Sequence, residues 1–223
     1  VFNATAKPAL IPMPQQVKWD SSYFPMYNCK AIIVKDSLFL NEGEKLQKLL
    51  LQNGWNIPIS NTANGKVIEL RFGDIPALQN KDEAYSIHAT TSSIIISANT
   101  SHGSFNAIQT FRQLMRDGKT IPSCTITDWP AFAWRGYMID AGRNYMPMNL
   151  LKQQVDVMSN YKLNIFHLHL TEDIAWRLAI KQYPQLTDPQ TMIRNKGQFY
   201  SEEELKELIA FCNERYITLV PEI

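Results

Sequence analysis

Polar and charged residues cluster directly after two short apolar runs in the second half of the chain. The runs cover residues 137–139 and 163–170, and an amphipathic stretch separates them. The residues near their ends that could do chemistry are Asp140, Arg143, His169, Glu172 and Asp173. This succession is typical of a βα unit leading into a parallel strand. Because ligands in parallel α/β folds bind outside the carboxyl ends of the strands, we expect a functional site at these residues.

Arg143 lies just beyond the first apolar run. A guanidinium there offers forked donors to paired acceptors such as a carboxylate, a phosphate or vicinal hydroxyls. It could equally form a salt bridge to Asp140 or another nearby acid. Position alone leaves both interpretations open.

His167 and His169 are two residues apart on a predicted strand, so their side chains face the same way. The pair is either a His-x-His metal site or a hydrogen-bonded histidine layer inside a barrel. A metal site needs a third and a fourth ligand, and the sequence offers none at a suggestive spacing. The second interpretation is therefore favoured.

Glu172 and Asp173 are paired acids, a combination that can serve as general acid, base or orienting group. Adjacent residues on an extended backbone diverge, so we expect one to face the site and the other to cap the chain or pair with Arg177. Trp176 follows in a loop, where it could form an aromatic wall for a sugar or anchor the loop.

The elements that must position these residues alternate from residue 134 onward. A helix is predicted over residues 147–161, and its buried stripe is Leu151, Val155 and Met158. A capping box, Ser201 to Glu204, starts a second helix. The predicted buried face of that second helix is Leu205, Leu208, Ile209 and Cys212. An apolar strand over residues 217–220 completes a pattern that predicts a barrel or a doubly wound sheet.

The number of residues in this part of the chain favours an incomplete barrel over a complete one. A complete (β/α)8 barrel needs about 250 residues, and only residues 134–223 are available for one. The chain also stops after an apolar strand that no helix follows. We therefore expect roughly the first three βα units of a truncated (β/α)8 TIM barrel over residues 129–223.

The first part of the chain reads as a separate α+β domain over residues 1–128, with a mixed sheet and two helices. Alternation predicts strands over residues 66–72 and 83–89, and a short apolar run predicts one over 31–34. Three consecutive isoleucines after a Thr-Thr-Ser turn predict a strand over 93–98, which should form a hairpin with the strand before it. On the strand over 66–72, Ile68, Leu70 and Phe72 should share one side. Helices are predicted over residues 41–52 and 102–116.

Composition excludes several classes of protein. The formal charge of +1 gives no strong field for nucleic acid or a membrane surface. No apolar run approaches the roughly 18 residues of a membrane span, and the start of the chain shows no signal peptide. Three distant cysteines show no metal-binding spacing and do not suggest a disulfide framework. Asn3 and Asn99 fit the short glycosylation pattern, which often matches by chance.

Several separated motifs, in order, resemble one known family. They are W-R-G-Y-M-I-D-A-G-R-N-Y-M-P, then L-N-I-F-H-L-H-L-T-E-D-I-A-W-R, then Y-I-T-L-V-P-E-I. This set is similar to the opening of the catalytic barrel of family 20 glycoside hydrolases, the β-N-acetylhexosaminidases. D-E-A-Y-S-I-H-A-T-T-S-S-I-I-I-S-A and G-S-F-N-A-I-Q-T-F-R-Q-L-M resemble the small domain that precedes that barrel. The likeness runs from about Ile11 to Ile223.

The resemblance implies an exported enzyme that releases terminal β-linked N-acetylglucosamine or N-acetylgalactosamine from glycans, with no metal or cofactor. It implies a substrate-assisted retaining mechanism, in which the acetamido oxygen of the substrate attacks the anomeric carbon. A glutamic acid protonates the leaving oxygen, and an aspartate orients the acetamido group.

Residue by residue, the resemblance implies that Arg143 grips sugar hydroxyls and that Glu172 replaces an aspartate which steadies the site. It implies that His169 belongs to the site wall and that Asp173 is structural. Nothing in this chain matches the family motif His-x-Gly-Gly-Asp-Glu, which carries the catalytic pair. We therefore expect that pair beyond Ile223, no catalytic residue in this chain, and no activity from this chain alone.

Two other functions remain open on the sequence. One is a metal-dependent barrel hydrolase that uses His167 and His169. The other is a non-catalytic carbohydrate-binding module with Arg143 and Trp176 as contacts. An incomplete barrel would also expose strand edges, through which copies of the chain could associate.

Overall fold

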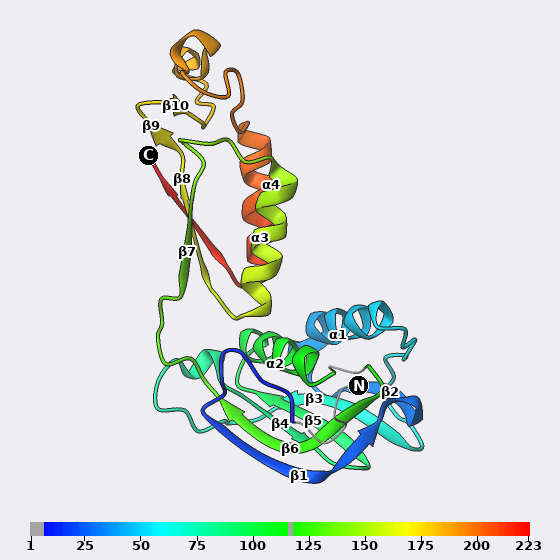
Figure 1. Ribbon diagram of the computed structural model, residues 1–223. Coiled ribbons are helices and arrows are strands. Elements are labelled where there is room, and N and C mark those ends of the chain that lie inside the picture. Colours follow the sequence, from blue (N-terminus) through cyan, green and yellow to red (C-terminus); the bar gives the residue numbers. More distant parts are fainter. Residues whose placement is uncertain (1–6, 116–117) are drawn as a thin grey trace. The chain divides into compact units, whose positions relative to one another are not determined.

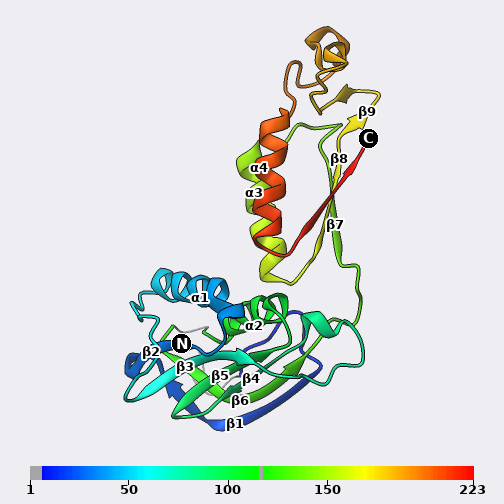
Figure 2. The same ribbon diagram turned by 180° about the vertical axis from the view of Figure 1, so that it is seen from behind.

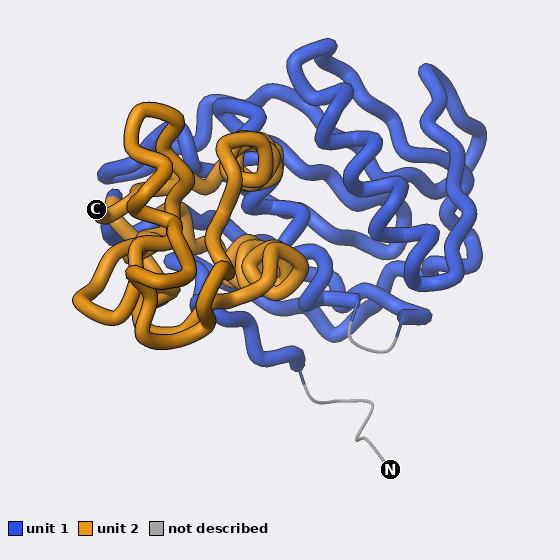
Figure 3. Tube along the Cα trace, turned by 90° about the horizontal axis from the view of Figure 1, so that it is seen from above, with its two compact units in different colours: residues 1–133 blue, residues 134–223 orange. Residues whose placement is uncertain are grey.

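A computed structural model describes residues 7–115 and 118–223 of the chain. The chain divides into two compact units, and the division falls between Ala133 and Trp134 (Figure 3). Each unit has its own sheet, its own helices and its own apolar core. The sequence predicts a boundary slightly earlier, after residue 128, which is where the last strand of the first unit ends.

The first unit is built on a six-stranded mixed sheet of order β1-β6-β4-β5-β3-β2. Its strands are β1 (Gln16–Pro25), β2 (Cys29–Val34), β3 (Lys66–Phe72), β4 (Tyr85–Ala89), β5 (Ser93–Ala98) and β6 (Thr120–Asp128). Strand β3 runs parallel to β2 and β5, whereas β4 is antiparallel to β5 and β6, and β1 to β6. Two helices, α1 (Leu40–Gln52) and α2 (Ser101–Leu114), lie on one face of this sheet (Figures 1 and 2).

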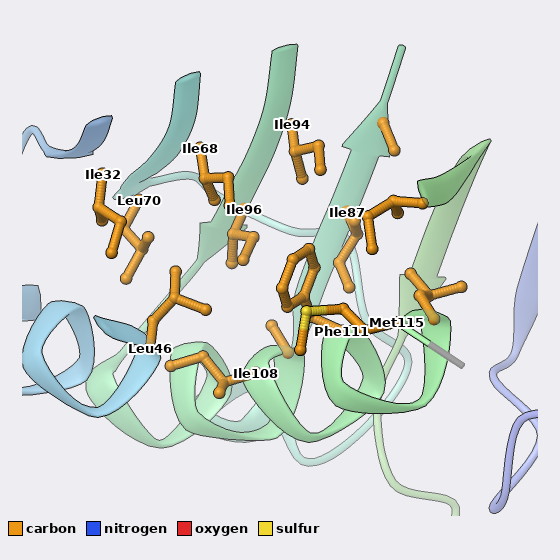
Figure 4. Close-up of a cluster of buried hydrophobic side chains, with 14 of the residues drawn as sticks. Ile32, Leu46, Ile68, Leu70, Ile87, Ile94, Ile96, Ile108, Phe111 and Met115 are labelled. Atoms are coloured by element: carbon orange, nitrogen blue, oxygen red, sulfur yellow. The ribbon is translucent and has the colours of Figure 1, made fainter. Parts of the chain in front are cut away.

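The core of this unit forms where α1 and α2 cover the sheet. Ile68, Ile87 and Ile96 point from the strands toward Leu46 of α1 and Phe111 of α2 (Figure 4). All five are at most 1% exposed. The predicted inner positions Ile68 and Leu70 of β3 and Ile87 of β4 are therefore confirmed.

Three details of this unit differ from the sequence prediction. Phe72 is 55% exposed, because it ends β3 beyond the part of the strand that the core covers. Residues 81–83 form a 3₁₀ turn, so β4 begins at Tyr85 rather than at residue 83. The predicted helix over 102–116 is α2, which starts at Ser101; residue 116 lies outside the described residues.

The second unit alternates strands and helices in the predicted order. It contains β7 (Gly136–Asp140), α3 (Met148–Asn160), β8 (Ile165–His169), α4 (Glu202–Asn213) and β11 (Thr218–Glu222). The three strands are parallel, and β8 lies between β7 and β11. A small hairpin of β9 (Thr171–Glu172) and β10 (Ala175–Trp176) follows β8 directly. The segment from there to α4 contains two 3₁₀ turns, Pro184–Thr187 and Pro189–Thr191.

Both helices of this unit cover the same face of its sheet (Figures 1 and 2). Phe166 and Leu168 of β8 are fully buried there, together with Leu151 and Val155 of α3. The predicted stripe of α3 is confirmed. On α4 only Leu208 and Cys212 are buried, and the prediction is wrong for Ile209, which is 40% exposed. Leu208 and Cys212 are about one turn apart on the helix and face the sheet, while Leu205 is half-buried and Phe211 packs partly buried against the same core.

The structure also bears on the sequence predictions about membrane spans, cysteines and glycosylation. In the part of the chain that the structure describes, no helix is long and apolar enough to cross a membrane. Cys29, Cys124 and Cys212 are free thiols. The Asn99 side-chain amide donates a 2.9 Å hydrogen bond to the Lys81 carbonyl, a contact that a glycan on this nitrogen would disrupt. Asn3 lies outside the described residues.

Candidate functional site

The site forms where the three parallel strands of the second unit end. Register places Asp140 of β7 beside His169 of β8, and His169 beside Glu222 of β11. Residues that are paired in register project to the same face of a sheet, so these three side chains form one polar row. The row lies at the carboxyl ends of the strands, where the sequence predicts a site.

Arg143 lies in the turn that follows β7, and its main chain and side chain are both held there. Its amide donates to Asp140 Oδ1 at 2.9 Å, and its Nε lies 3.2 Å from Asp140 Oδ2. Its Nη2 lies 3.2 Å from Glu172 Oε1. The side chain is nevertheless 61% exposed, so the guanidinium is both ion-paired and open to a ligand. The salt bridge that the sequence left as an alternative therefore exists and still leaves donors available.

Glu172 reaches the site because the tight β9–β10 hairpin turns the chain back directly after β8. Its Oε1 accepts from Arg143 and lies 3.3 Å from Nε2 of His169. Gly142 leaves room for this approach, because a Cβ there would lie 3.1 Å from Cγ of Glu172, a tight contact that would push the side chain away. One of the two adjacent acids thus faces the site, as predicted.

The other acid, Asp173, is exposed at the tip of the hairpin. Of the two alternatives for this acid, the pairing with Arg177 is wrong. Arg177 is fully buried, and its guanidinium donates instead to main-chain carbonyls, among them those of Ala141 and Arg194.

His169 lies between two carboxylates. Its Nδ1 is 2.8 Å from Glu222 Oε2, and its Nε2 is 3.3 Å from Glu172 Oε1. The hydrogen bond to Glu222 raises the pKa of His169 above its usual value, and partial desolvation opposes this rise. The same bond lowers the pKa of Glu222. The arrangement therefore favours an imidazolium between two carboxylates.

His167 faces the same way as His169, as the sequence predicts, and its Nε2 lies 2.7 Å from the same Glu222 oxygen. A shared carboxylate between two histidines fits the hydrogen-bonded histidine layer. Among the described residues, the group whose ligand atoms lie within 4.8 Å of one another is Asp140, His169 and Glu172, without His167. The Arg143 guanidinium already bridges the two acids of that group, so the positive charge that a metal would supply is present.

Glu222 lies at the centre of the polar row, between His167 and His169, although the sequence prediction gave it no role in the site. The signal for it in the sequence was its place at the end of the third strand.

Trp176 is half-buried, and its Nε1 donates to the Leu178 carbonyl at 2.6 Å. That hydrogen bond favours the loop anchor over a free aromatic wall for a ligand.

Comparison with known proteins gives the same family for both units. Residues 7–129 match the model of glycosyl hydrolase family 20, domain 2, and residues 132–223 match that of the family 20 catalytic domain. The two units thus define a glycoside hydrolase chain with its preceding domain. This chain belongs to glycosyl hydrolase family 20, which confirms the resemblance seen in the sequence.

Individual relatives support the same family assignment. A β-hexosaminidase from Porphyromonas gingivalis is 31% identical over an alignment that covers 96% of this chain and 30% of that protein. A β-hexosaminidase from Vibrio furnissii is 37% identical over 63% of this chain and 26% of its own length. The structure of an exo-β-N-acetylglucosaminidase from Vibrio harveyi in complex with N-acetylglucosamine superposes with a TM-score of 0.85 at 28% identity. That likeness covers 98% of this chain and 36% of the Vibrio harveyi chain. The chain therefore spans about a third of these relatives.

Proposed function

We propose that this chain is part of a β-N-acetylhexosaminidase that hydrolyses terminal β-linked N-acetylglucosamine or N-acetylgalactosamine in glycans. The observation that carries the proposal is the Arg143–Glu172–His169 cluster at the carboxyl ends of parallel strands in a family 20 catalytic unit. The family resemblance adds the expectation that the enzyme is exported.

The second unit supplies the first three strands of a (β/α)8 barrel in this proposal. Strands β7, β8 and β11 are adjacent and parallel, and both helices lie on one face. In a closed barrel that face is the outer one, and the opposite face, with Asp140, His167 and His169, is the interior. The remaining strands, with the acid that protonates the leaving group, lie outside this chain. This chain alone is then inactive.

The cluster binds and orients the sugar in this proposal. The exposed guanidinium of Arg143 donates to two vicinal hydroxyls, a geometry that suits its planar fork. Asp140 and Glu172 fix the direction of that fork, because each holds one of its nitrogens at 3.2 Å. His169 in turn fixes Glu172 through its Nε2.

The test is Arg143→Ala in the complete enzyme, assayed with an aryl N-acetyl-β-glucosaminide. Losing charge-assisted hydrogen bonds to the sugar should lower kcat/KM by about tenfold to a hundredfold. Arg71→Ala is a matched control, because Arg71 is also an exposed arginine paired with an acid, Glu69, but lies in the first unit. The control should keep full activity.

Two results would contradict the proposal. One is an unchanged kcat/KM in Arg143→Ala. The other is clear turnover by this 223-residue chain alone that survives the same substitution.

A further inference from the structure

Arg177 is a fully buried arginine that forms no ion pair with an acid among the described residues. It follows β10 directly, and every nitrogen of its guanidinium donates to a main-chain carbonyl. The acceptors are Ala141 at 3.2 Å and Gly142 at 3.3 Å from Nε, Asn195 at 3.0 Å and Gln198 at 2.9 Å from Nη1, and Arg194 at 2.8 Å from Nη2. Burying a charge is costly unless it is fully hydrogen-bonded, so this set of partners is what keeps the guanidinium in place.

The first group of acceptors is the turn that carries Arg143. The carbonyls of Ala141 and Gly142 both accept from Nε of Arg177. The amides of the same two residues donate to the carbonyl of His169, at 2.9 and 3.1 Å. The two residues before Arg143 are therefore held from both sides, by β8 and by the buried guanidinium.

The second group of acceptors is the segment over residues 194–198. Side chains of this segment also reach the turn: Asn195 Oδ1 accepts from the Tyr145 amide at 3.2 Å, and Arg194 donates to Asn144 Oδ1 at 3.0 Å. Arg177 thus lies between two chain segments that also contact each other directly. Removing the guanidinium of Arg177 would therefore weaken the packing of both segments, the turn before Arg143 and residues 194–198.

We propose that Arg177 is a positioning residue for sugar binding, which acts by fixing the turn that presents Arg143. The inference rests on the proposed function. A lysine at this position would keep the charge but has no planar fork, so it could not serve acceptors on both segments together. The turn would then sample positions in which Arg143 no longer meets the sugar hydroxyls.

A double-mutant cycle in the complete enzyme separates positioning from general stability. Arg177→Lys should lower kcat/KM by about tenfold or more, mainly by raising KM, because small misplacements of a binding group have large effects. In an Arg143→Ala background the same change should cost less than about twofold, since residues that act through each other are not additive. Equal losses in the two backgrounds, or no loss in either, would overturn the proposal.

Arg215→Lys is the matched control. Arg215 is another largely buried arginine of the second unit, bound to Asp156 and to the Phe211 carbonyl, but it precedes β11 at the opposite end of the sheet. This control should leave kcat/KM unchanged. A loss as large as that of Arg177→Lys would show that any buried arginine of the unit has the same effect, and would refute a specific role.

Hydrogen exchange gives a readout that does not depend on activity. In Arg177→Lys the amides of Gly142 and Tyr145 should exchange at least about tenfold faster, because opening of the turn becomes easier. Unchanged exchange would refute the positioning role. If the wild-type enzyme does not cleave the aryl glycoside, the proposed function fails, and exchange still decides whether Arg177 holds the turn.

Asn195→Gly serves if Arg177→Lys does not fold. Asn195 has a φ of 49°, which glycine adopts without strain, so the substitution removes only the side-chain bond to Tyr145. It should raise KM relative to the wild-type enzyme and show the same non-additivity with Arg143→Ala. Simple additivity with Arg143→Ala would count against the proposal.

Discussion

His169 and Glu222 make the protonation state of the site depend on pH in a defined way. Their hydrogen bond raises the pKa of His169 above 6.5 and lowers that of Glu222 below 4.5. The contribution of His169 to stability is complete below 6.5 and disappears as pH rises through its raised pKa. The contribution of Glu222 is complete above 4.5 and disappears as pH falls through its lowered pKa. The pair is therefore strongest between these limits.

Titration of the His169 ring by NMR checks this coupling. We expect an apparent pKa above 6.5 in the wild-type chain and a lower one in Glu222→Gln, which removes the negative charge and keeps the shape. The direct 2.8 Å contact is the physical reason. A pKa that does not change in Glu222→Gln would show that this bond does not control His169.

Individual residues show what a sequence can reveal about a site. Arg143, His169 and Glu172 could be singled out because each lies just after or at the end of an apolar run. Glu222 ends the third apolar run in the same way, but its contact with both histidines follows only from the register of β11 against β8. Arg177 could not be singled out, because its partners are carbonyls that every residue type carries.

The capping box at the start of α4 is the element whose contribution can be measured most directly. Ser201 Oγ accepts from the Glu204 amide, and the Glu204 carboxylate accepts from the Ser201 amide. Ser201→Ala should lower the free energy of unfolding by about 1 kcal/mol, because an amide of the first turn loses its partner. Ser201→Asp is the control that keeps an acceptor and should lose little.

Urea denaturation of the two variants provides the measurement. A loss in Ser201→Asp as large as that in Ser201→Ala would contradict the capping explanation. The denaturation slope should stay unchanged, since neither substitution alters the surface exposed on unfolding.

At the scale of elements, periodicity predicted α1, α3 and β3 well, and an apolar run after a turn predicted β5, but neither signal predicted β1 and β6. Strand β1 contains a bulge at Asp20–Ser22, where Asp20 Oδ1 accepts from the Ser22 amide and gives the segment the sequence of a turn. Strand β6 contains Pro122, which normally argues against a strand inside a sheet. Pro122 is accommodated because β4 pairs with β6 only from Cys124 onward. Both strands depend on pairing with distant segments, which local patterns do not encode.

For the whole molecule, the open edges of the second sheet are the main physical consequence of its three-stranded form. Among residues 7–115 and 118–223, strands β7 and β11 each pair on one side only. Unpaired edges favour association with another chain. We therefore expect this chain alone to associate as its concentration rises, whereas in a complete barrel further strands would cover both edges.

Sedimentation velocity checks the association. Met138 is 52% exposed on the edge strand β7, so Met138→Lys places a charge there and should shift the distribution toward monomer. Val157→Lys is a control, because Val157 is similarly exposed at 50% but lies on α3, away from the edge. A wild-type chain that stays monomeric at all concentrations would contradict this expectation.

The main-chain partners of Arg177 also bear on how this protein can change over evolutionary time. Residues 141, 142, 194, 195 and 198 offer only their carbonyls to the guanidinium, so a substitution at one of them needs no compensating change at Arg177. Arg177 itself has no equivalent substitute. Contacts between side chains often show up as covariation between two positions of a family. We expect no such covariation between position 177 and the five positions whose carbonyls bind Arg177. The link between these two segments would persist in diverging relatives through one invariant arginine, while its carbonyl partners are constrained by their own contacts and not by the guanidinium.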